Sequence, residues 1–517
     1  MPRKDPRMKE LHEWQKKIIL SGGPERIKKQ HAKGKLTARE RLGLLLDPGS
    51  FNELEPFVTP RGDLLGDAAG RVPGDGVVVG FGKVDGRTVY VYAQDFTVHG
   101  GTLGEMHSRK ICRIMDLAVQ NGKPILGLLD SGGARIQEGI HSLNGYGEIF
   151  QRNALYSGRV PQISILLGPC AGGAAYSPAL TDLIIMVEKQ SFMFLTGPEV
   201  IKAVTNEIVD SAGLGGAEVH TAVSGTAHLA ASSEREALSL ARLALSYLPS
   251  NHTEPPPLAH TGDDPRRMDP ALNALVPLDP SEPYNMHAVL VSVVDQGTLL
   301  ELMPSWAKNA IIGLARLAGR SVGIVAQEPS VMAGVLDIDA ADKIARFVRL
   351  CDCFGLPIVT FVDSPGFLPG VAQEHGGVIR HGAKVLYAYS EAVVPKVSVI
   401  TRKAYGGSYI VMSSKSLGAD LAFAWPSAEI AVMGAEGAVN ILYRNEIASA
   451  GDPEAARKKY ADEYRQKFSS PYQAASAGFI DDVIEPGVTR PRLIAALDAL
   501  QNKTLVRPSR RHGNMPV

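Results

Sequence analysis

The stretch ILGLLDSGGARIQEG, residues 125–139, decides the fold. Its first five residues form an apolar run, and a Gly-rich turn follows one residue later. A strand that is apolar on both faces is typical of a parallel sheet covered by helices on both sides. The stretch IVTFVDSPGFLPG, residues 358–370, repeats this pattern. We therefore expect an α/β fold with parallel strands.

Both stretches belong to a longer repeat, in which residue types recur at an offset of 233 or 234 positions. The pairs, in chain order, are Gly86 with Gly319, Gln94 with Gln327, Lys110 with Lys343, Gly122 with Gly355, Pro124 with Pro357, Asp130 with Asp363, Ser131 with Ser364, and Gly172-Gly173 with Gly406-Gly407. The period is far too long for a solenoid. It predicts two homologous domains, residues 1–258 and 284–517, joined by a Pro-rich linker at residues 259–283.

Each copy predicts the same order of elements. A strand pair closes at a tight turn, Asp85-Gly86 in the first copy and Ala318-Gly319 in the second. A helix that ends before Gly and Pro comes next, and two buried strands follow it. The predicted helices are residues 105–120 and 340–354, and the predicted strands are 125–130, 163–168, 358–363 and 396–401.

The overall composition excludes several classes of partner. The chain has 54 Lys plus Arg and 54 Asp plus Glu, so no general basic field attracts nucleic acid or an anionic membrane. Its four cysteines include no Cys-x-x-Cys pair, which favours a reducing compartment and argues against a zinc ribbon. We see neither a signal or transit peptide nor an apolar stretch long enough for a membrane span. We expect a cytoplasmic protein, or a matrix protein if the source is eukaryotic.

The N-terminal segment, residues 1–41, is the exception to this neutrality, with 13 Lys or Arg against 5 Asp or Glu. We expect an amphipathic arm that packs on a neighbour. A phosphate-binding role is the alternative.

A second Gly-rich turn in each copy points to a reaction type. It reads GPCAGGAAY at residues 168–176 and RKAYGGSYI at residues 402–410. In both, a strand ends, paired glycines follow, and small residues open a helix. Adjacent backbone N–H groups without side chains over them can form an oxyanion hole. The alternative is close packing of a helix on a strand.

Motifs for other chemistries are absent from the sequence. It contains no HExxH, no GxSxG, no P-loop and no GxGxxG, so we expect neither a bound metal nor bound ATP. Ser131 and Ser364 have no recognisable base nearby, which favours turn roles over nucleophilic ones. The repeated oxyanion turns suggest an enolate-type intermediate, with the proton chemistry supplied by a cofactor.

Several motifs together resemble the carboxyltransferase (beta) subunits of biotin-dependent acyl-CoA carboxylases, above all propionyl-CoA carboxylase. They are DSGGARIQEG, GPCAGGAAYSPALTD, FVDSPGFLPG, RHGAK, TRKAYGGSYIVMSSK and WPSAEIAVMG. The resemblance extends from KLTARERL at residues 35–42 to the terminal HGNMPV. It implies two crotonase-fold (ββα spiral) domains and a homo-hexamer, a trimer of dimers. In that hexamer the N-terminal half of one subunit faces the C-terminal half of another.

The resemblance also implies a mechanism. Carboxybiotin releases CO2, the biotin ureido anion takes the α proton of the acyl thioester, and the enolate attacks CO2. The first half would bind acyl-CoA, with Gly172 and Gly173 holding the enolate oxygen. The second half would bind biotin, with Gly407 and Ser408 holding the ureido oxygen. These four are the expected catalytic residues, all through backbone N–H groups.

Further site residues follow from the same motifs. The expected substrate-binding residues are Ser131, Gly132, Gly133, Ala134, Arg135, Tyr176 and Ile410, and the expected biotin-binding residues are Gly366, Phe367, Tyr405 and Gly406. Arg135 either contacts CoA or locks its own turn. Ile410 stands where propionyl-preferring relatives often have Asp, which leaves acetyl- and butyryl-CoA open as substrates.

The chain carries neither a biotinylation motif nor an ATP-binding loop, so the expected partners are a biotin carboxylase and a biotin carboxyl carrier. A sodium-pumping methylmalonyl-CoA decarboxylase, whose alpha subunit the motifs also resemble, would run the transfer in reverse. A biotin-independent crotonase-type hydratase would need a carboxylate or amide base over the acyl carbon. A non-enzymatic CoA-binding scaffold would have no use for two matched oxyanion turns.

Overall fold

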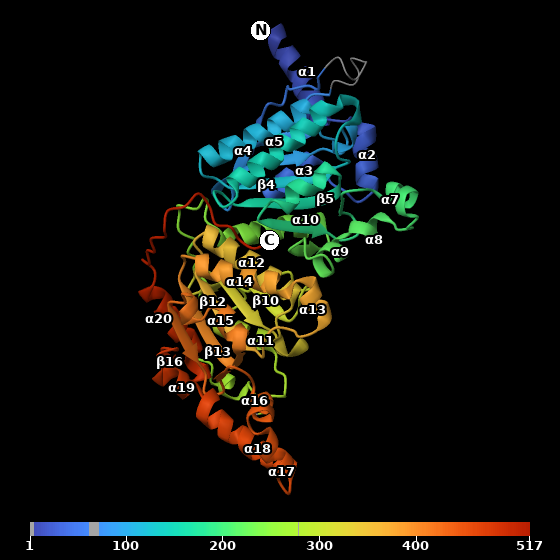
Figure 1. Ribbon diagram of the computed structural model, residues 1–517. Coiled ribbons are helices and arrows are strands. Elements are labelled where there is room, and N and C mark those ends of the chain that lie inside the picture. Colours follow the sequence, from blue (N-terminus) through green and yellow to red (C-terminus); the bar gives the residue numbers. More distant parts are fainter. Residues whose placement is uncertain (1–4, 62–71, 278) are drawn as a thin grey trace. The chain divides into compact units, whose positions relative to one another are not determined.

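The computed structural model of the protein describes residues 5–61, 72–277 and 279–517 (Figure 1). The chain divides into two compact units, Met1–Pro255 and Pro256–Val517. Among the described residues, each unit contains an eight-stranded sheet with helices packed against it. The prediction of an α/β fold is thereby confirmed.

The first unit opens with three helices and then alternates strands and helices. Its elements are α1 Pro6–Leu20, α2 Pro24–Ala32, α3 Ala38–Leu45, β1 Asn52–Leu54, β2 Val77–Val84, β3 Arg87–Gln94, α4 Glu105–Gln120, β4 Ile125–Ser131, α5 Ile140–Tyr156, β5 Gln162–Ala171, α6 Gly173–Ala179, β6 Leu183–Val187, β7 Phe192–Phe194, α7 Pro198–Thr205, α8 Ser211–Gly215, α9 Ala217–Ala222, β8 Leu229–Ala231 and α10 Glu234–Tyr247.

The second unit repeats this order and adds helices near its C-terminus. Its elements are α11 Met286–Val293, β9 Leu300–Leu302, β10 Ala310–Leu317, β11 Arg320–Gln327, α12 Ile338–Cys353, β12 Ile358–Ser364, α13 Val371–Gly376, α14 Val378–Glu391, β13 Lys396–Tyr405, α15 Gly406–Val411, β14 Leu421–Ala424, β15 Glu429–Ala431, α16 Ala435–Leu442, α17 Arg444–Ser449, α18 Pro453–Tyr464, α19 Pro471–Ser476, β16 Asp482–Val483 and α20 Thr489–Ala499.

The two sheets have the same topology. The strand order is β1-β2-β3-β4-β5-β6-β8 in the first unit and β9-β10-β11-β12-β13-β14-β16 in the second. A short strand also pairs with the end of the fifth position, β7 on β5 and β15 on β13. The first three strands of each sheet are antiparallel and the rest are parallel. The internal repeat in the sequence is therefore a repeat of architecture.

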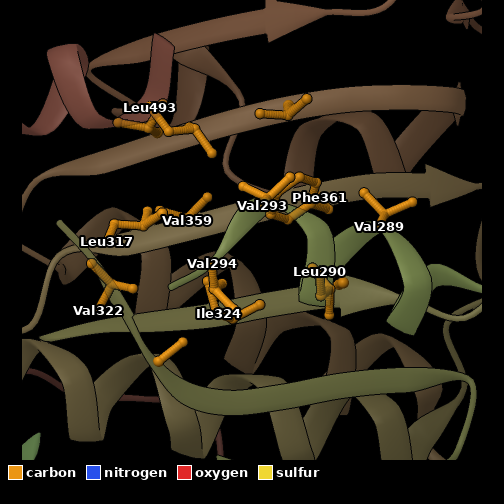
Figure 2. Packing of buried hydrophobic residues seen from close by; sticks show 14 of the residues in the cluster. Val289, Leu290, Val293, Val294, Leu317, Val322, Ile324, Val359, Phe361 and Leu493 are labelled. Atoms are coloured by element: carbon orange, nitrogen blue, oxygen red, sulfur yellow. The ribbon is translucent and has the colours of Figure 1, made fainter. Parts of the chain in front are cut away.

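Each sheet is held by its own core of side chains. In the second unit, Val359 and Phe361 of β12 are fully buried in a cluster that also contains Val289 and Val293 of α11 (Figure 2). Burying a side chain of this size contributes about 1.5–3 kcal/mol. Strands β4 and β12 are buried along their whole length. Because consecutive strand residues point to opposite faces, both faces of these strands must be covered. Their unbroken apolar sequences reflect this double burial.

Described residues of the segment expected to be a linker, residues 259–283, pack against the second unit. The Ala259 N–H donates to the Gly319 carbonyl oxygen at 3.0 Å. Leu272 is 4% exposed and belongs to the core of that unit. Arg267 forms an ion pair with Asp263 and donates to two carbonyl oxygens at the end of α11.

Within the described residues, no helix has the length and apolar character needed to cross a bilayer.

Candidate functional site

The first Gly-rich turn of each unit follows a central parallel strand and is closed by a serine. The Gly133 N–H donates to Ser131 Oγ at 3.1 Å, and the Gly366 N–H donates to Ser364 Oγ at 3.4 Å. Both serines are fully buried. The expected turn role of these hydroxyls matches their positions.

The residues after Ser131 are packed tightly against the neighbouring strand. A Cβ at Gly133 would lie 2.7 Å from the carbonyl oxygen of Ala171, the last residue of β5. The Gly132 N–H donates to the Gly100 carbonyl oxygen, and Gly132 itself is exposed. Ala134 is half-buried and forms a bridge to Leu103. The structure thus places this turn directly beside the end of β5.

Arg135 is committed to its own turn. Its guanidinium is 1% exposed and forms ion pairs with Asp75 at 2.6 Å and Glu138 at 2.7 Å. It also donates to the Thr102 carbonyl oxygen at 2.8 Å. Burial raises the pKa of Asp75, and Arg135 opposes this rise. These are the contacts of the alternative prediction, in which Arg135 locks its own turn.

The second Gly-rich turn of the first unit lies where β5 runs into α6. Gly172 has φ +59°, which disfavours other residues. Its N–H donates to the Phe194 carbonyl oxygen of β7 at 2.9 Å. In the described part of the chain, the N–H groups of Gly173 and Ala174 meet no acceptor. The prediction of Gly172 as an oxyanion donor therefore needs correction, because the two available donors are Gly173 and Ala174.

The matching turn of the second unit lies where β13 runs into α15. Gly406 has φ +54°, in the same region as Gly172. The N–H groups of Gly407 and Ser408 meet no acceptor among the described residues. The Ser408 hydroxyl is buried and donates to the Tyr405 carbonyl oxygen at 2.7 Å. Gly407 and Ser408 occupy the positions that correspond to Gly173 and Ala174.

Aromatic rings flank both turns. A Cβ at Gly173 would lie 2.8 Å from the ring of Tyr146, and burial raises the pKa of that tyrosine. Tyr176 follows on α6 and is 51% exposed. In the second unit, a Cβ at Gly407 would lie 3.7 Å from the Phe367 ring, at ordinary contact distance. Apolar walls beside free N–H groups exclude water and strengthen the interaction of those groups with a ligand oxygen.

The remaining predicted residues differ in their access to solvent. Gly366 has φ +141° and is half-buried beside Phe367. Tyr405 is 8% exposed, and its hydroxyl donates to the Glu429 carboxylate, so its ring serves the packing of the turn. Ile410 is 44% exposed and lies in α15, two residues after Ser408. Among the described residues, no group of His, Cys, Asp or Glu side chains could hold a metal ion.

One cluster beside the site was missed by the sequence interpretation. The carboxylate of Asp130 accepts from Lys35 Nζ at 2.7 Å and from Arg41 Nη1 at 2.9 Å. Arg41 also forms an ion pair with Glu234 at 2.6 Å. Burial lowers the pKa of Lys35, and the charge of Asp130 opposes this effect. Part of the basic N-terminal segment therefore packs inside the first unit, under the Ser131 turn.

Comparison with known proteins places the chain in a family. Residues 29–515 match the model of the carboxyl transferase domain. The carboxyltransferase subunit of propionyl-CoA carboxylase from Haloferax mediterranei is 56% identical, and the match covers 99% of each chain. The methylmalonyl-CoA decarboxylase subunit alpha of Propionigenium modestum is 54% identical, again over 99% of each chain.

A solved structure agrees with these sequence matches. A transcarboxylase 12S hexamer with methylmalonyl-coenzyme A and methylmalonic acid bound superposes with a TM-score of 0.96. It is 52% identical, and the match covers 99% of this chain and 98% of the other. This match and the duplicated sheets confirm the prediction of two crotonase-fold domains. The chain belongs to the carboxyl transferase domain family and is an acyl-CoA carboxyltransferase.

Proposed function

We propose that this chain is the carboxyltransferase subunit of a biotin-dependent acyl-CoA carboxylase. It moves a carboxyl group from carboxybiotin to the α carbon of propionyl-CoA and gives methylmalonyl-CoA. The observation that carries this proposal is the matched pair of turns, each of which offers two backbone N–H groups that meet no acceptor among the described residues. Two such sites in one chain suit a reaction in which two carbonyl oxygens gain negative charge.

In the first unit, Gly173 and Ala174 would donate to the thioester oxygen of acyl-CoA. These donors stabilise the enolate more than the ground-state thioester, because the oxygen carries more charge in the enolate. One donor of this kind contributes about 3 kcal/mol. Gly132, Gly133 and Ala134 would form the wall of the same site through their backbone, and Arg135 would hold that wall in place.

The second unit offers a donor set that fits biotin. The ureido group has one carbonyl oxygen that can accept two hydrogen bonds, and Gly407 and Ser408 supply two adjacent N–H groups. The Phe367 ring beside Gly407 would cover the apolar bicycle. Once bound, carboxybiotin supplies the carboxyl group and then the base for the α proton. This chain then needs no acid or base side chain of its own, only fixed donors.

The proposed acyl pocket accepts more than one short acyl chain. In the proposed hexamer, Ile410 of a neighbouring copy would lie at the end of the acyl pocket, and its apolar, branched side chain suits short acyl groups such as acetyl, propionyl and butyryl. The similarity to propionyl-CoA carboxylase subunits supports propionyl-CoA as the main substrate.

The reverse transfer is the second candidate function. It is favoured by the 54% identity to methylmalonyl-CoA decarboxylase subunits, which is nearly equal to the 56% identity to the carboxylase subunit from Haloferax mediterranei. The same two turns would serve either direction. The partner decides between them, since a carboxylase complex contains an ATP-dependent biotin carboxylase and a decarboxylase complex contains a membrane subunit. Affinity purification of the chain from its native cell identifies that partner.

A biotin-independent hydratase finds less support. It needs a free carboxylate over the acyl carbon. Asp130, directly before the Ser131 turn, is buried and forms ion pairs with Lys35 and Arg41. The next acidic residue along the chain is Glu138. This side chain is buried, pairs with Arg135 and accepts the Glu105 N–H at 2.6 Å. Both of its oxygens therefore already accept hydrogen bonds from the protein, which makes it a poor base for an attacking water.

We also propose that the chain forms a homo-hexamer and works with separate biotin carboxylase and carrier subunits. Corresponding helices in the two units, α7 and α16, carry exposed apolar side chains that suit contacts between copies: Val200, Val204, Ile441 and Leu442. The relative with a solved hexamer supports the same state. Light scattering should give six times the 55.2 kDa of one chain.

The proposed activity is tested with the purified chain, methylmalonyl-CoA and free biotin. Carboxyl transfer to biotin releases propionyl-CoA, which chromatography separates from its precursor. We expect propionyl-CoA to form only when biotin is present. Hydration of crotonyl-CoA without biotin, together with no transfer, would instead support the hydratase.

A further inference from the structure

Asp130 and Asp363 occupy the same place in the two units, and each faces an irregularity in the neighbouring strand. In the first unit the register passes from Leu129 opposite Leu166 to Ser131 opposite Cys170. In the second it passes from Val362 opposite Ile400 to Ser364 opposite Ala404. Two extra residues on the longer strand therefore stand opposite each aspartate. The proposed oxyanion turn begins directly after this bulge.

In the second unit, residues of the bulge itself donate hydrogen bonds to the Asp363 carboxylate. Arg402 donates from Nε to Asp363 Oδ2 at 3.0 Å, and the Lys403 N–H donates to Oδ1 at 3.1 Å. Asp363 is fully buried, and burial raises the pKa of its carboxyl while Arg402 opposes the rise. One side chain and one backbone N–H of β13 thus hold this carboxylate against the strand.

In the first unit, the residues at the corresponding positions can supply neither bond. The internal repeat aligns Gly168 with Arg402 and Pro169 with Lys403. Glycine has no side chain and proline has no N–H. A Cβ at Gly168 would lie 2.0 Å from Asp130 Oδ1 and 2.5 Å from Lys35 Nζ. The ammonium of Lys35 therefore occupies the space that a side chain at position 168 would need.

The N-terminal segment replaces both donors. Lys35 Nζ donates to Asp130 Oδ1 at 2.7 Å, and Arg41 Nη1 donates to Oδ2 at 2.9 Å. Arg41 reaches further, because its Nη2 donates to the carbonyl oxygen of Leu167, inside the bulge, at 3.1 Å. Glu234 accepts two bonds from the same guanidinium. All four charged side chains are buried, with two positive and two negative charges.

We propose that Lys35 and Arg41 are positioning residues of the acyl-CoA half of the enzyme, and that the segment around them is an integral part of that half-site. This inference rests on the proposed function. The two cations hold Asp130 against β5, as Arg402 and Lys403 hold Asp363 against β13. Without them, a buried carboxylate would face the bulge unpaired and the strand end would shift.

A short chain of close contacts connects Asp130 to the proposed oxyanion donors. Asp130 is followed by Ser131, whose hydroxyl holds the Gly133 N–H. Gly133 approaches the carbonyl oxygen of Ala171 so closely that no side chain fits between them. The donors Gly173 and Ala174 follow within three residues. A displacement of about 1 Å at such donors is enough to cost orders of magnitude in rate.

Lys35→Met and Arg41→Lys test this inference in the full-length chain. The assay is the transfer from methylmalonyl-CoA to free biotin, with kcat and both KM values measured. Each variant should lower kcat at least about tenfold and leave the KM for free biotin within about twofold of the parent value. Lys35→Arg, which keeps the cation, should retain a larger share of kcat than Lys35→Met. Arg41→Lys keeps the charge and is expected to fold even if Lys35→Met does not.

Arg39→Met is the matched control. Arg39 lies in the same segment and pairs with Glu53 at 2.6 Å instead of with Asp130. Its kcat should stay within about twofold of the parent value. If the parent itself shows no transfer, the proposed function fails. If the parent is active and folded Lys35→Met or Arg41→Lys matches it in kcat, the positioning role is wrong.

Discussion

The Gly172 N–H donates to the Phe194 carbonyl oxygen at 2.9 Å, which removes it from the set of free donors in the second Gly-rich turn of the first unit. The bond exists because β7 pairs with the end of β5, with Ala171 opposite Phe194. The free donors are consequently one residue further along the chain, at Gly173 and Ala174. They correspond to Gly407 and Ser408 in the second unit, so the two proposed oxyanion sites use equivalent positions.

Ala174→Pro should abolish most of the activity, because proline removes the N–H donor. The first turn of a helix tolerates proline, so the fold should survive. We expect kcat for transfer to fall by about 10²–10³. Ala174→Ser keeps the N–H and copies Ser408 at the equivalent position, so its kcat should stay close to the parent value. Equal kcat values for the two variants would show that this N–H plays no part.

Arg135→Met should act on stability. It leaves the carboxylates of Asp75 and Glu138 buried without their cation, which costs about 3–5 kcal/mol. Urea denaturation measures this loss. Arg109→Met is the control, because Arg109 is 63% exposed in its pair with Glu105 and should change the unfolding free energy by less than about 1 kcal/mol. An Arg135→Met protein with parental stability and a raised KM for acyl-CoA would restore the CoA contact.

His287 should make stability depend on pH. Hydrogen bonds to the carboxylates of Glu301 and Glu328 raise its pKa from 6.5 to about 9. Since the folded state holds the proton more tightly, this stabilisation is fully present below pH 6.5 and is lost as the pH rises through about 9. The difference in unfolding free energy between the parent and His287→Gln should therefore shrink over this range. Urea denaturation at about pH 6 and about pH 9.5 checks it. A difference that stays constant would contradict the assignment.

Ile410→Ala should change the preference for the acyl chain. The smaller side chain leaves room for one or two more methylene groups, and each is worth about 1–3 kcal/mol in an apolar pocket. We expect the ratio of kcat/KM for butyryl-CoA over propionyl-CoA to rise about tenfold. Competition between the two substrates in one reaction measures the ratio directly. An unchanged ratio would remove Ile410 from the acyl pocket.

Much of the fold could be predicted because its signals lie between residues close in sequence and occur in both copies of the repeat. The helix predicted at residues 105–120 is α4 with the same bounds, since Gly122 and Pro124 end it. The turns at Asp85-Gly86 and Ala318-Gly319 have positive φ at all four residues, as tight hairpin turns require. The buried strands read as apolar runs because both of their faces are covered.

The parts that could not be predicted depend on contacts between distant residues. Whether Arg135 locks its turn is decided by Asp75, which lies 60 residues earlier. The partner of Asp130 is Lys35, 95 residues away, and no local pattern links them. The one available signal was the mismatch of Gly168-Pro169 with Arg402-Lys403, which marks missing donors in the first copy. This mismatch indicates that residues elsewhere in the chain donate to Asp130, but it does not identify them.

The most direct test of the central claim compares Gly407→Pro with Gly407→Ala in the transfer from methylmalonyl-CoA to free biotin. Among the residues that the structure describes, a Cβ at this position meets only the Phe367 ring, at 3.7 Å, so alanine keeps both the packing and the N–H. We predict that Gly407→Ala stays within about fivefold of the parent kcat and that Gly407→Pro loses about 10²–10³. A folded Gly407→Pro enzyme with the kcat of Gly407→Ala would contradict the account.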